Sequence, residues 1–224
     1  MRNLVVFGES GVGKSSLINI CAGEAVAETS SGAIGCTFEF TRYTITIDGE
    51  TFGIWDTVGL DEGTYGKVPA EQAEDKLKKL LQELVKASGV DLLIYCVRGT
   101  RMRKVLQKNY ALFYSVICRK KVPIVLVVTG LEHHQDDMEG WWRENGDEFR
   151  KLSMRFSDHA CVTTLDPNVV QSGLLKDRCE QSRQAVRRLI CKTVRTEEWR
   201  AAEKSWIDAV VSDVRGMIGS KSEE

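Results

Sequence analysis

A long hydrophobic run, a strong net charge and paired cysteines are all missing from this chain of 224 residues. No stretch approaches the roughly 20 apolar residues that a membrane-spanning helix needs, so we expect no transmembrane segment. The formal net charge is only −1, and without a basic excess we expect no nucleic-acid partner. There is no internal repeat or low-complexity segment, and the length suits one domain with a sizeable core.

The cysteines also indicate an ordinary reduced protein. There are seven of them, scattered along the chain, and no two form a C-x-x-C pair. An odd number without metal-ligand spacing, together with the lack of a signal peptide, predicts reduced thiols and a cytoplasmic location. Several cysteines lie in apolar runs, where they are expected to act as small core residues.

The stretch FGESGVGKSS, residues 7–16, is the strongest signal that is present. Its glycines and the Lys14-Ser15 pair match G-x-x-x-x-G-K-[ST], in which successive backbone N–H groups point at phosphate oxygens. An apolar run at 3–7 predicts the strand that should precede such a loop. Apolar spacing over 15–22 predicts the helix that should follow it, with the positive end of its dipole beneath the anion.

The side chains of this loop have separate expected roles. Lys14 should reach the β- and γ-phosphates, and the Ser15 hydroxyl should take one Mg²⁺ position. A glycine-rich structural turn is the alternative interpretation. The expected nucleotide contacts of the loop are Glu9, Ser10, Gly11, Val12, Gly13, Lys14, Ser15 and Ser16.

Strand-like and helix-like segments alternate along the rest of the chain. Runs at 90–97 and 122–128 are β-branched and apolar on all sides, as central parallel strands are, and a further parallel strand is expected at 160–163. Helical spacing predicts helices at 69–87 and 105–118. The predicted fold is α/β, with three αβα layers around a mostly parallel sheet.

One antiparallel hairpin interrupts the alternation. Segments 38–47 and 51–55 are rich in β-forming residues and flank Asp48-Gly49, which is a strong two-residue turn signal. The hairpin belongs to the first domain, which we expect at 1–194.

The C-terminal part is expected to be helical at 195–219, with a flexible tail at 220–224. The apolar residues of this extension predict a stripe that packs back on the domain, and contact with a partner or a second copy is the alternative. The stripe residues are Trp199, Trp206, Val210 and Val214.

Two further segments have the composition of phosphate sensors. Asp56 and Gly59 form a D-x-x-G pattern where the second hairpin strand ends, so that Asp56 can hold Mg²⁺ through water and the Gly59 N–H can contact the γ-phosphate. Thr37 lies at the start of the first hairpin strand. Its hydroxyl is placed to bind Mg²⁺ and its N–H to bind the γ-phosphate, although an ordinary β-branched strand start is the alternative.

These motifs, followed by a strand that ends in VVTGLE, give the chain a family resemblance. Over roughly residues 3 to 192 it resembles the G domain of translation-factor-type P-loop GTPases. Within them it is similar to the branch of septins, immunity-associated GTPases and chloroplast import receptors, and to small orphan fungal G proteins. The resemblance implies a Ras-like fold, Mg²⁺ and a cycle between GTP and GDP. The family roles in phosphate and metal binding match Lys14, Ser15, Thr37, Asp56 and Gly59.

The base-reading motif departs from the family pattern of Asn or Thr, Lys, any residue and Asp. Here it reads Thr129-Gly130-Leu131-Glu132. In the family the lysine stem covers one face of the base, and Gly130 removes that cover. Glu132 retains the carboxylate that accepts hydrogen bonds from guanine, so a weakened guanine preference is expected, with some binding of ATP.

Other residues are weighed for the remaining base contacts. His133, His134, Trp141 and Trp142 are candidates for the missing cover, although the tryptophans are better explained as core residues and the histidines as polar loop residues. By position alone, Thr163 or Thr164 is the candidate for the last base-contact loop.

Catalysis also departs from the Ras-like pattern. Leu60 follows D-x-x-G, where a Gln would orient the attacking water, so slow hydrolysis is expected. Related enzymes with this substitution often complete the site across a dimer, and the loop VRGTRMRK resembles the import-receptor loop that offers an arginine. Arg98, Arg101 or Arg103 is therefore a candidate for neutralising phosphate charge in a second copy, with a solvated basic loop as the alternative.

Three classes of function are compatible with the first loop. A regulatory GTPase switch, with guanine nucleotide, a homodimer across the nucleotide face and an effector protein as partners, is favoured. A nucleotide-dependent assembly module with little hydrolysis, or a relaxed NTPase, is the second class. A P-loop small-molecule kinase is disfavoured because the hairpin with its flanking Thr37 and D-x-x-G belongs to switch proteins.

Overall fold

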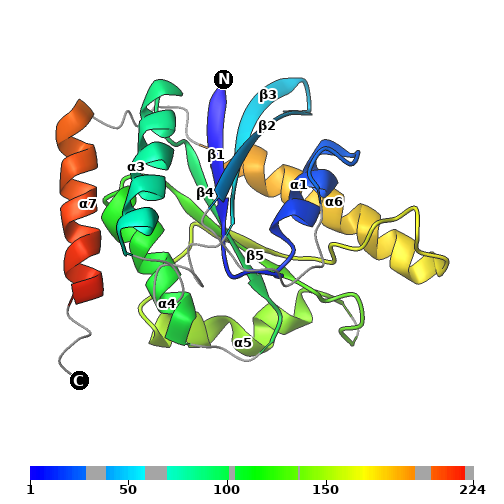
Figure 1. The fold of residues 1–224 in the computed structure, drawn as a ribbon. Helices are drawn as coiled ribbons and strands as arrows, with labels where there is room; N and C mark the ends of the chain where they lie inside the picture. Colours follow the sequence, from blue (N-terminus) through cyan, green and yellow to red (C-terminus); the bar gives the residue numbers. More distant parts are fainter. Residues whose placement is uncertain (29–38, 59–69, 101–103, 136, 195–202, 220–224) are drawn as a thin grey trace.

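The computed structural model describes residues 1–28, 39–58, 70–100, 104–135, 137–194 and 203–219. At its centre is a six-stranded sheet with the order β2-β3-β1-β4-β5-β6 (Figure 1). β2 and β3 are antiparallel, and the other neighbouring strands are parallel. The mostly parallel α/β sheet with one antiparallel pair is therefore confirmed. The strands are β1 (Arg2–Phe7), β2 (Glu39–Ile47), β3 (Glu50–Val58), β4 (Leu92–Arg98), β5 (Ile124–Thr129) and β6 (Asp158–Cys161).

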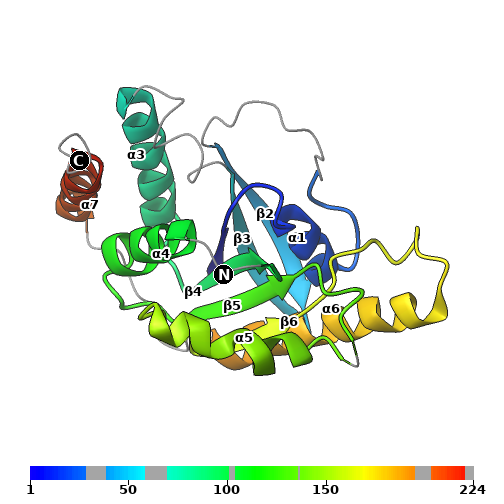
Figure 2. The same cartoon turned by 90° about the horizontal axis from the view of Figure 1, so that it is seen from below.

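Helices cover both faces of the sheet, as Figures 1 and 2 show. α1 and α6 contribute to one apolar cluster with the sheet, and α3, η1, α5 and α7 contribute to the other. No described helix combines the length and apolar composition that crossing a membrane requires. The helices are α1 (Lys14–Ala22), α3 (Ala70–Lys86), α4 (Lys104–Tyr110), the π-helix η1 (Ala111–Ile117), α5 (Gly140–Lys151), α6 (Gly173–Thr193) and α7 (Glu203–Gly219).

The central strands are apolar throughout because each face of the sheet meets helices. In β5, Val125 and Val127 belong to the cluster with α1 and α6, whereas Leu126 and Val128 belong to the cluster on the other face. Successive side chains of a strand point to opposite faces, so a strand that is buried on both sides has a continuous apolar sequence.

The hairpin turns at Asp48-Gly49 as the sequence predicts. The φ angles of the two residues are 50° and 86°, so both residues adopt the left-handed conformation that a type I′ turn requires. This turn fixes the register of β2 on β3, which extends to Val58 and places Asp56 near the end of its strand.

Two elements differ from the sequence prediction. The helix expected over 105–118 changes to a π-helix at Ala111, and the Cys118 N–H bonds to the Phe113 carbonyl over five residues, at 3.0 Å. The strand expected at 160–163 lies two residues earlier because β6 begins with polar residues. Asp158 forms an ion pair with Lys192, and His159 stacks on Trp142, so neither side chain reveals a strand by its hydropathy.

α7 packs on α3 and η1, and it lies outermost on that side (Figure 1). The Trp206 indole N–H donates to the Ile117 carbonyl at 2.9 Å, and Arg215 forms an ion pair with Glu74 of α3. Trp199, predicted for the same apolar stripe, lies outside the described residues. The buried apolar residues of α7 are Trp206, Val210, Val211 and Val214.

Candidate functional site

The candidate site lies at one edge of the sheet, where the carboxyl ends of the parallel strands meet. Parallel α/β sheets bind their ligands at this edge. The phosphate loop follows β1, Asp56 lies in β3, and Arg98 ends β4. The base-reading loop follows β5, and Thr163 follows β6.

The phosphate loop has the backbone that its glycines permit. Gly8 has a φ of 146°, and a Cβ there would lie 2.1 Å from the Cys96 carbonyl oxygen, so no larger residue fits. Gly13 precedes α1 with a φ of 93°. The Lys14 ammonium group is buried and donates to the carbonyl oxygens of Gly8 and Glu9, at 2.8 and 2.9 Å. The loop therefore closes around the lysine that should contact phosphate.

Ser15 and Asp56 meet beside this lysine. The Ser15 hydroxyl donates to Asp56 Oδ2 at 2.7 Å. Asp56 Oδ1 is buried and has no hydrogen-bond partner within the described part of the chain. Burial raises the pKa of the Asp56 carboxyl, while the Ser15 hydrogen bond and the Lys14 charge act in the opposite direction. A hydroxyl next to an unpaired carboxylate oxygen fits a hard, oxygen-seeking cation such as Mg²⁺.

Thr129 joins the phosphate loop to the base-reading loop. Its buried hydroxyl lies 2.6 Å from the Val12 carbonyl oxygen and 3.2 Å from that of Val97. Thr129 is also an expected nucleotide contact, and its hydroxyl lies between these two main-chain carbonyl oxygens. Gly130 then turns the chain with a φ of 77°, and the Leu131 N–H donates to the Val162 carbonyl.

The two threonines after β6 have different surroundings. The buried Thr163 hydroxyl donates to Glu132 Oε2 at 3.1 Å, and the Thr163 N–H donates to the Ser182 hydroxyl at 3.0 Å. Thr164 lies against the phosphate loop, since a Cβ on Gly13 would be 2.9 Å from its Oγ1. Thr163 therefore orients the carboxylate that should read the base, while Thr164 lies beside the phosphate site.

Arg178 is a residue of this site that the sequence did not reveal. It extends from α6, is 7% exposed, and donates to the carbonyl oxygens of Glu132 and His134 at 2.7 and 2.9 Å. A longer contact of 3.4 Å reaches the Leu131 carbonyl. It lies in a highly charged helical stretch, where an arginine normally indicates a solvated face, so no sequence signal distinguishes it.

Three of the four aromatic candidates for covering the base have other contacts, and the fourth, His133, is exposed. Trp141 is buried in the core. Trp142 stacks on His159, with ring centroids 4.1 Å apart. The His134 Nδ1 lies 2.9 Å from the Gln135 carbonyl oxygen, in the turn that precedes α5. The tryptophans are therefore packing residues.

Arg98 lies beside the base-reading loop. A Cβ on Gly130 would be 3.3 Å from both the Cγ and the Nε of Arg98. The other predicted residues of the switch segments and of the basic loop lie outside the described residues. These are Thr37, Gly59, Leu60, Arg101 and Arg103.

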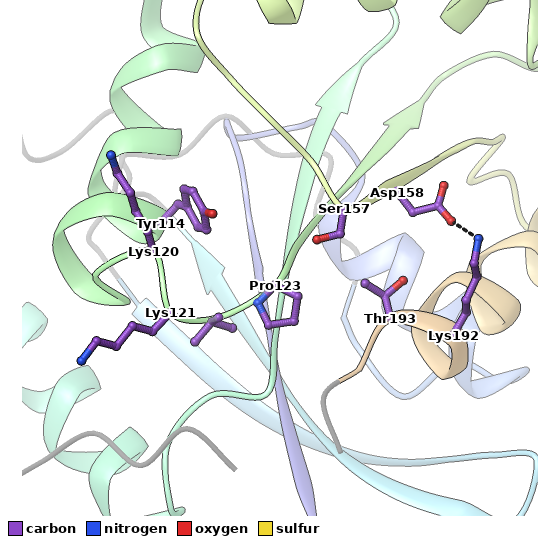
Figure 3. A pocket seen from close by; sticks show the side chains of 9 residues that line it. Tyr114, Lys120, Lys121, Pro123, Ser157, Asp158, Lys192 and Thr193 are labelled. Atoms are coloured by element: carbon purple, nitrogen blue, oxygen red, sulfur yellow. Dashed lines mark hydrogen bonds and ion pairs between the residues drawn. The ribbon is translucent and has the colours of Figure 1, made fainter. Parts of the chain in front are cut away.

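A cavity of about 400 Å³ lies at the opposite edge of the sheet (Figure 3). Pro123 precedes β5 and Ser157 precedes β6, so the cavity opens at the amino ends of these strands. The ion pair between Asp158 and Lys192 lines one side at 2.8 Å. This cavity is separate from the phosphate loop.

A family model described as 50S ribosome-binding GTPase matches residues 3–130, which is more than half of the chain. The chain belongs to this GTPase family. It is a P-loop GTPase domain, and the resemblance stated from the sequence is confirmed.

GTPase Der of Campylobacter curvus is 30% identical over 141 residues, which cover 63% of this chain and 28% of that protein. GTPase Der of Helicobacter hepaticus is 29% identical over 143 residues, covering 63% and 26%. The match thus spans less than a third of these relatives.

Solved structures of Toc33 and Era share the fold of this GTPase domain. A dimerization-deficient mutant of Toc33 from Arabidopsis thaliana has a TM-score of 0.53 and 19% identity, and the match covers 99% of this chain and 85% of that one. Era from Aquifex aeolicus, bound to GDP and AlF4⁻, has a TM-score of 0.57 and 15% identity, with coverage of 88% and 59%. At these identities the likeness extends to the fold alone.

Proposed function

We propose that this GTPase domain binds GTP and GDP with Mg²⁺, hydrolyses GTP slowly, and acts as a nucleotide-controlled switch. The observation that carries the proposal is the contact between Ser15 and Asp56, at 2.7 Å, beside the buried Lys14. The side chains expected to bind phosphate (Lys14) and Mg²⁺ (Ser15 and Asp56) in a P-loop GTPase thus lie next to one another.

The phosphate loop supplies most of the binding. When nucleotide enters, Lys14 exchanges the carbonyl oxygens of Gly8 and Glu9 for β- and γ-phosphate oxygens, and its charge strengthens each hydrogen bond. The backbone N–H groups from Gly11 to Ser16 line the phosphates. α1 begins at Lys14, so the partial positive charge of its N-terminus lies beneath them.

Ser15, Asp56 and Thr37 would hold the metal. Mg²⁺, when bound, would neutralise negative charge on the phosphates. Ser15 would offer its hydroxyl, and Asp56 would offer its unpaired Oδ1. A Toc33 structure with 20% identity and a TM-score of 0.51 contains Mg²⁺ and GMPPNP, which supports the same ligands for this fold.

Glu132 is the proposed reader of guanine. Its carboxylate can accept hydrogen bonds from the guanine edge, and the Thr163 hydroxyl holds one of its oxygens at 3.1 Å. Arg178 fixes the main chain on either side of Glu132. A carboxylate that is held in this way discriminates against adenine, which presents an acceptor where guanine presents a donor.

Hydrolysis is proposed to be slow because Leu60 cannot orient the attacking water. A second copy of the chain, bound across the nucleotide face, is proposed to complete the catalytic site. Gly59 and Thr37 would contact the γ-phosphate, and Arg101 is the proposed source of the cation from the second copy. Arg98 was an equal candidate and is considered below. A mutant of the structural neighbour Toc33 is described as dimerization-deficient, which supports dimerisation within this fold.

Released phosphate, measured over a range of protein concentrations with Mg²⁺ and GTP, tests the proposal. Specific activity should rise with protein concentration, and Lys14→Ala should abolish both binding and release. Constant specific activity would remove the dimer from the proposal. Tight binding with no release at any concentration would indicate an assembly module, and retained binding by Lys14→Ala would refute the phosphate-loop assignment.

A further inference from the structure

We propose that Arg98 covers one face of the bound base, in the space that Gly130 leaves open. The inference rests on the proposed binding of guanine nucleotide and assigns a residue to a contact that this chain's own motif lacks. It also distinguishes Arg98 from Arg101, because the Arg98 side chain lies beside its own base-reading loop.

The position of Arg98 follows from the sheet. Arg98 ends β4 and pairs with Thr129 of β5, and the Gly99 N–H continues the ladder by donating to the Thr129 carbonyl at 2.8 Å. The side chain therefore leaves β4 directly beside the residue that begins the base-reading loop. Gly99 allows this approach, because a Cβ there would lie 2.4 Å from Cδ2 of the buried Leu131.

Arg98 also occupies the direction in which a side chain at position 130 would leave the backbone. A Cβ on Gly130 would lie 3.3 Å from Arg98 Cγ, 3.3 Å from Nε and 3.7 Å from Cζ. The stem and the guanidinium plane both pass this point. In the family pattern the residue at position 130 covers the base with its stem, so Arg98 lies where that cover is needed.

The two residues are complementary. The φ of 77° at Gly130 suits glycine, and the missing side chain makes room for Arg98. A planar guanidinium stacks on the face of a base and adds a cation–π attraction. Arg98 is exposed, so its plane is accessible to a ligand. The tryptophans near the site do not compete for this role, since Trp141 is buried and Trp142 stacks on His159.

Stacking and edge reading have different consequences for selectivity. Every purine offers the same kind of face, so the loss of a stacking partner weakens GTP, GDP and ATP by the same factor. The loss of the Glu132 carboxylate instead weakens GTP relative to ATP. A catalytic arginine would change hydrolysis and leave GDP binding unaltered.

Calorimetric titrations of GTP, GDP and ATP in Mg²⁺ test the assignment, on the wild type, on Arg98→Ala and on a charge-matched control, Arg188→Ala. Arg188 is an exposed residue of α6. Arg98→Ala should weaken all three nucleotides by about tenfold with an unchanged GTP to ATP ratio, and Arg188→Ala should bind as the wild type does. The unfolding midpoint of Arg98→Ala should be unchanged because the side chain is exposed.

Unchanged affinities in Arg98→Ala would overturn the assignment, and slower phosphate release at unchanged affinity would give Arg98 a catalytic role instead. An equal loss of nucleotide affinity in Arg188→Ala would show that the effect comes from net charge alone, and it would also overturn the assignment. If the wild type itself bound no nucleotide, the proposed function would fail first. The wild-type titration therefore distinguishes the two failures.

Discussion

The Thr129 hydroxyl lies 2.6 Å from the main-chain carbonyl oxygen of Val12, and the two residues are 117 positions apart in the sequence. Val12 belongs to the loop that should hold phosphates, and Thr129 begins the loop that should hold the base. The hydrogen bond between them is buried. It fixes the distance between the two halves of the nucleotide site before any ligand enters.

Removing this hydroxyl should weaken every nucleotide alike. Thr129→Val has nearly the same shape but leaves the Val12 carbonyl without its partner, which costs about 1–3 kcal/mol. We expect GTP and GDP affinities to fall by about tenfold in calorimetric titrations, with a lower unfolding midpoint. Thr129→Ser keeps the hydroxyl and should bind as the wild type does. A Thr129→Val protein with wild-type affinity would contradict the coupling of the two loops.

Arg178 should be required for the order of the base-reading loop. Arg178→Met keeps most of the apolar stem and removes the donors to the carbonyls of Glu132 and His134. The unpaired carbonyls should lower the free energy of unfolding by about 2 kcal/mol and reduce the ratio of GTP to ATP affinity. Arg188→Met, on the exposed side of the same helix, is the matched control. An equal loss of stability in both variants, with the GTP to ATP ratio unaltered, would contradict this role.

The ionised Asp56 carboxylate should lower the stability of the nucleotide-free protein while it provides a ligand for Mg²⁺. Burial raises its pKa above the ordinary value of 3.8, so the folded protein binds this proton more tightly than the unfolded chain does. The resulting stabilisation is complete below pH 3.8 and is lost as the pH rises through the folded-state pKa. Above that pKa the buried charge destabilises the nucleotide-free protein.

Asp56→Asn removes the charge and keeps an oxygen that can accept from Ser15. At pH 7 without Mg²⁺ or nucleotide, the variant should be more stable than the wild type by about 1 kcal/mol, and it should no longer bind Mg²⁺ with GTP. The difference should shrink as the pH falls towards the pKa of Asp56. Thermal unfolding between pH 4 and 8 measures it, and a less stable variant at pH 7 would contradict the expected sign.

The attachment of α7 should depend on Trp206 far more than on Arg215. Trp206 is buried and bonded to the Ile117 carbonyl, so Trp206→Ala should cost about 3 kcal/mol of unfolding free energy. Arg215 lies on the surface, and exposed ion pairs contribute little, so Arg215→Ala should change the unfolding midpoint only slightly. Chemical denaturation of both variants provides the comparison. A loss in Arg215→Ala as large as that in Trp206→Ala would contradict this ranking of the two contacts.

The sequence predicted those parts of the fold in which local pattern and tertiary environment agree. The apolar runs of β4 and β5 are buried on both faces, and Asp48-Gly49 forms the expected turn. The predicted bounds of β6 were two residues too late because its first residues, Asp158 and His159, have polar and aromatic partners that are distant in the sequence. No local pattern records such partners.

The residues of the candidate site also divide into those that local sequence patterns predict and those that depend on tertiary contacts. Lys14, Ser15 and Asp56 belong to motifs with fixed spacing, and the structure brings them together. Arg178 and the pairing of Arg98 with Gly130 depend on how α6 and β4 approach the base-reading loop. Nothing in the sequence favoured Thr163 over Thr164. In the structure, the register of β6 against β5 places Thr163 against Glu132 and Thr164 beside Gly13.

The measurement that tests the account most directly is an equilibrium titration of GTP against ATP in Mg²⁺, on the wild type and on Glu132→Gln. A switch whose base is read by Glu132 should bind GTP at least about tenfold more tightly than ATP. Glu132→Gln should lose most of that ratio while it retains ATP binding. Equal affinities for GTP and ATP in the wild type would contradict the account, because the loop that Thr129, Thr163 and Arg178 hold in place would then not select guanine.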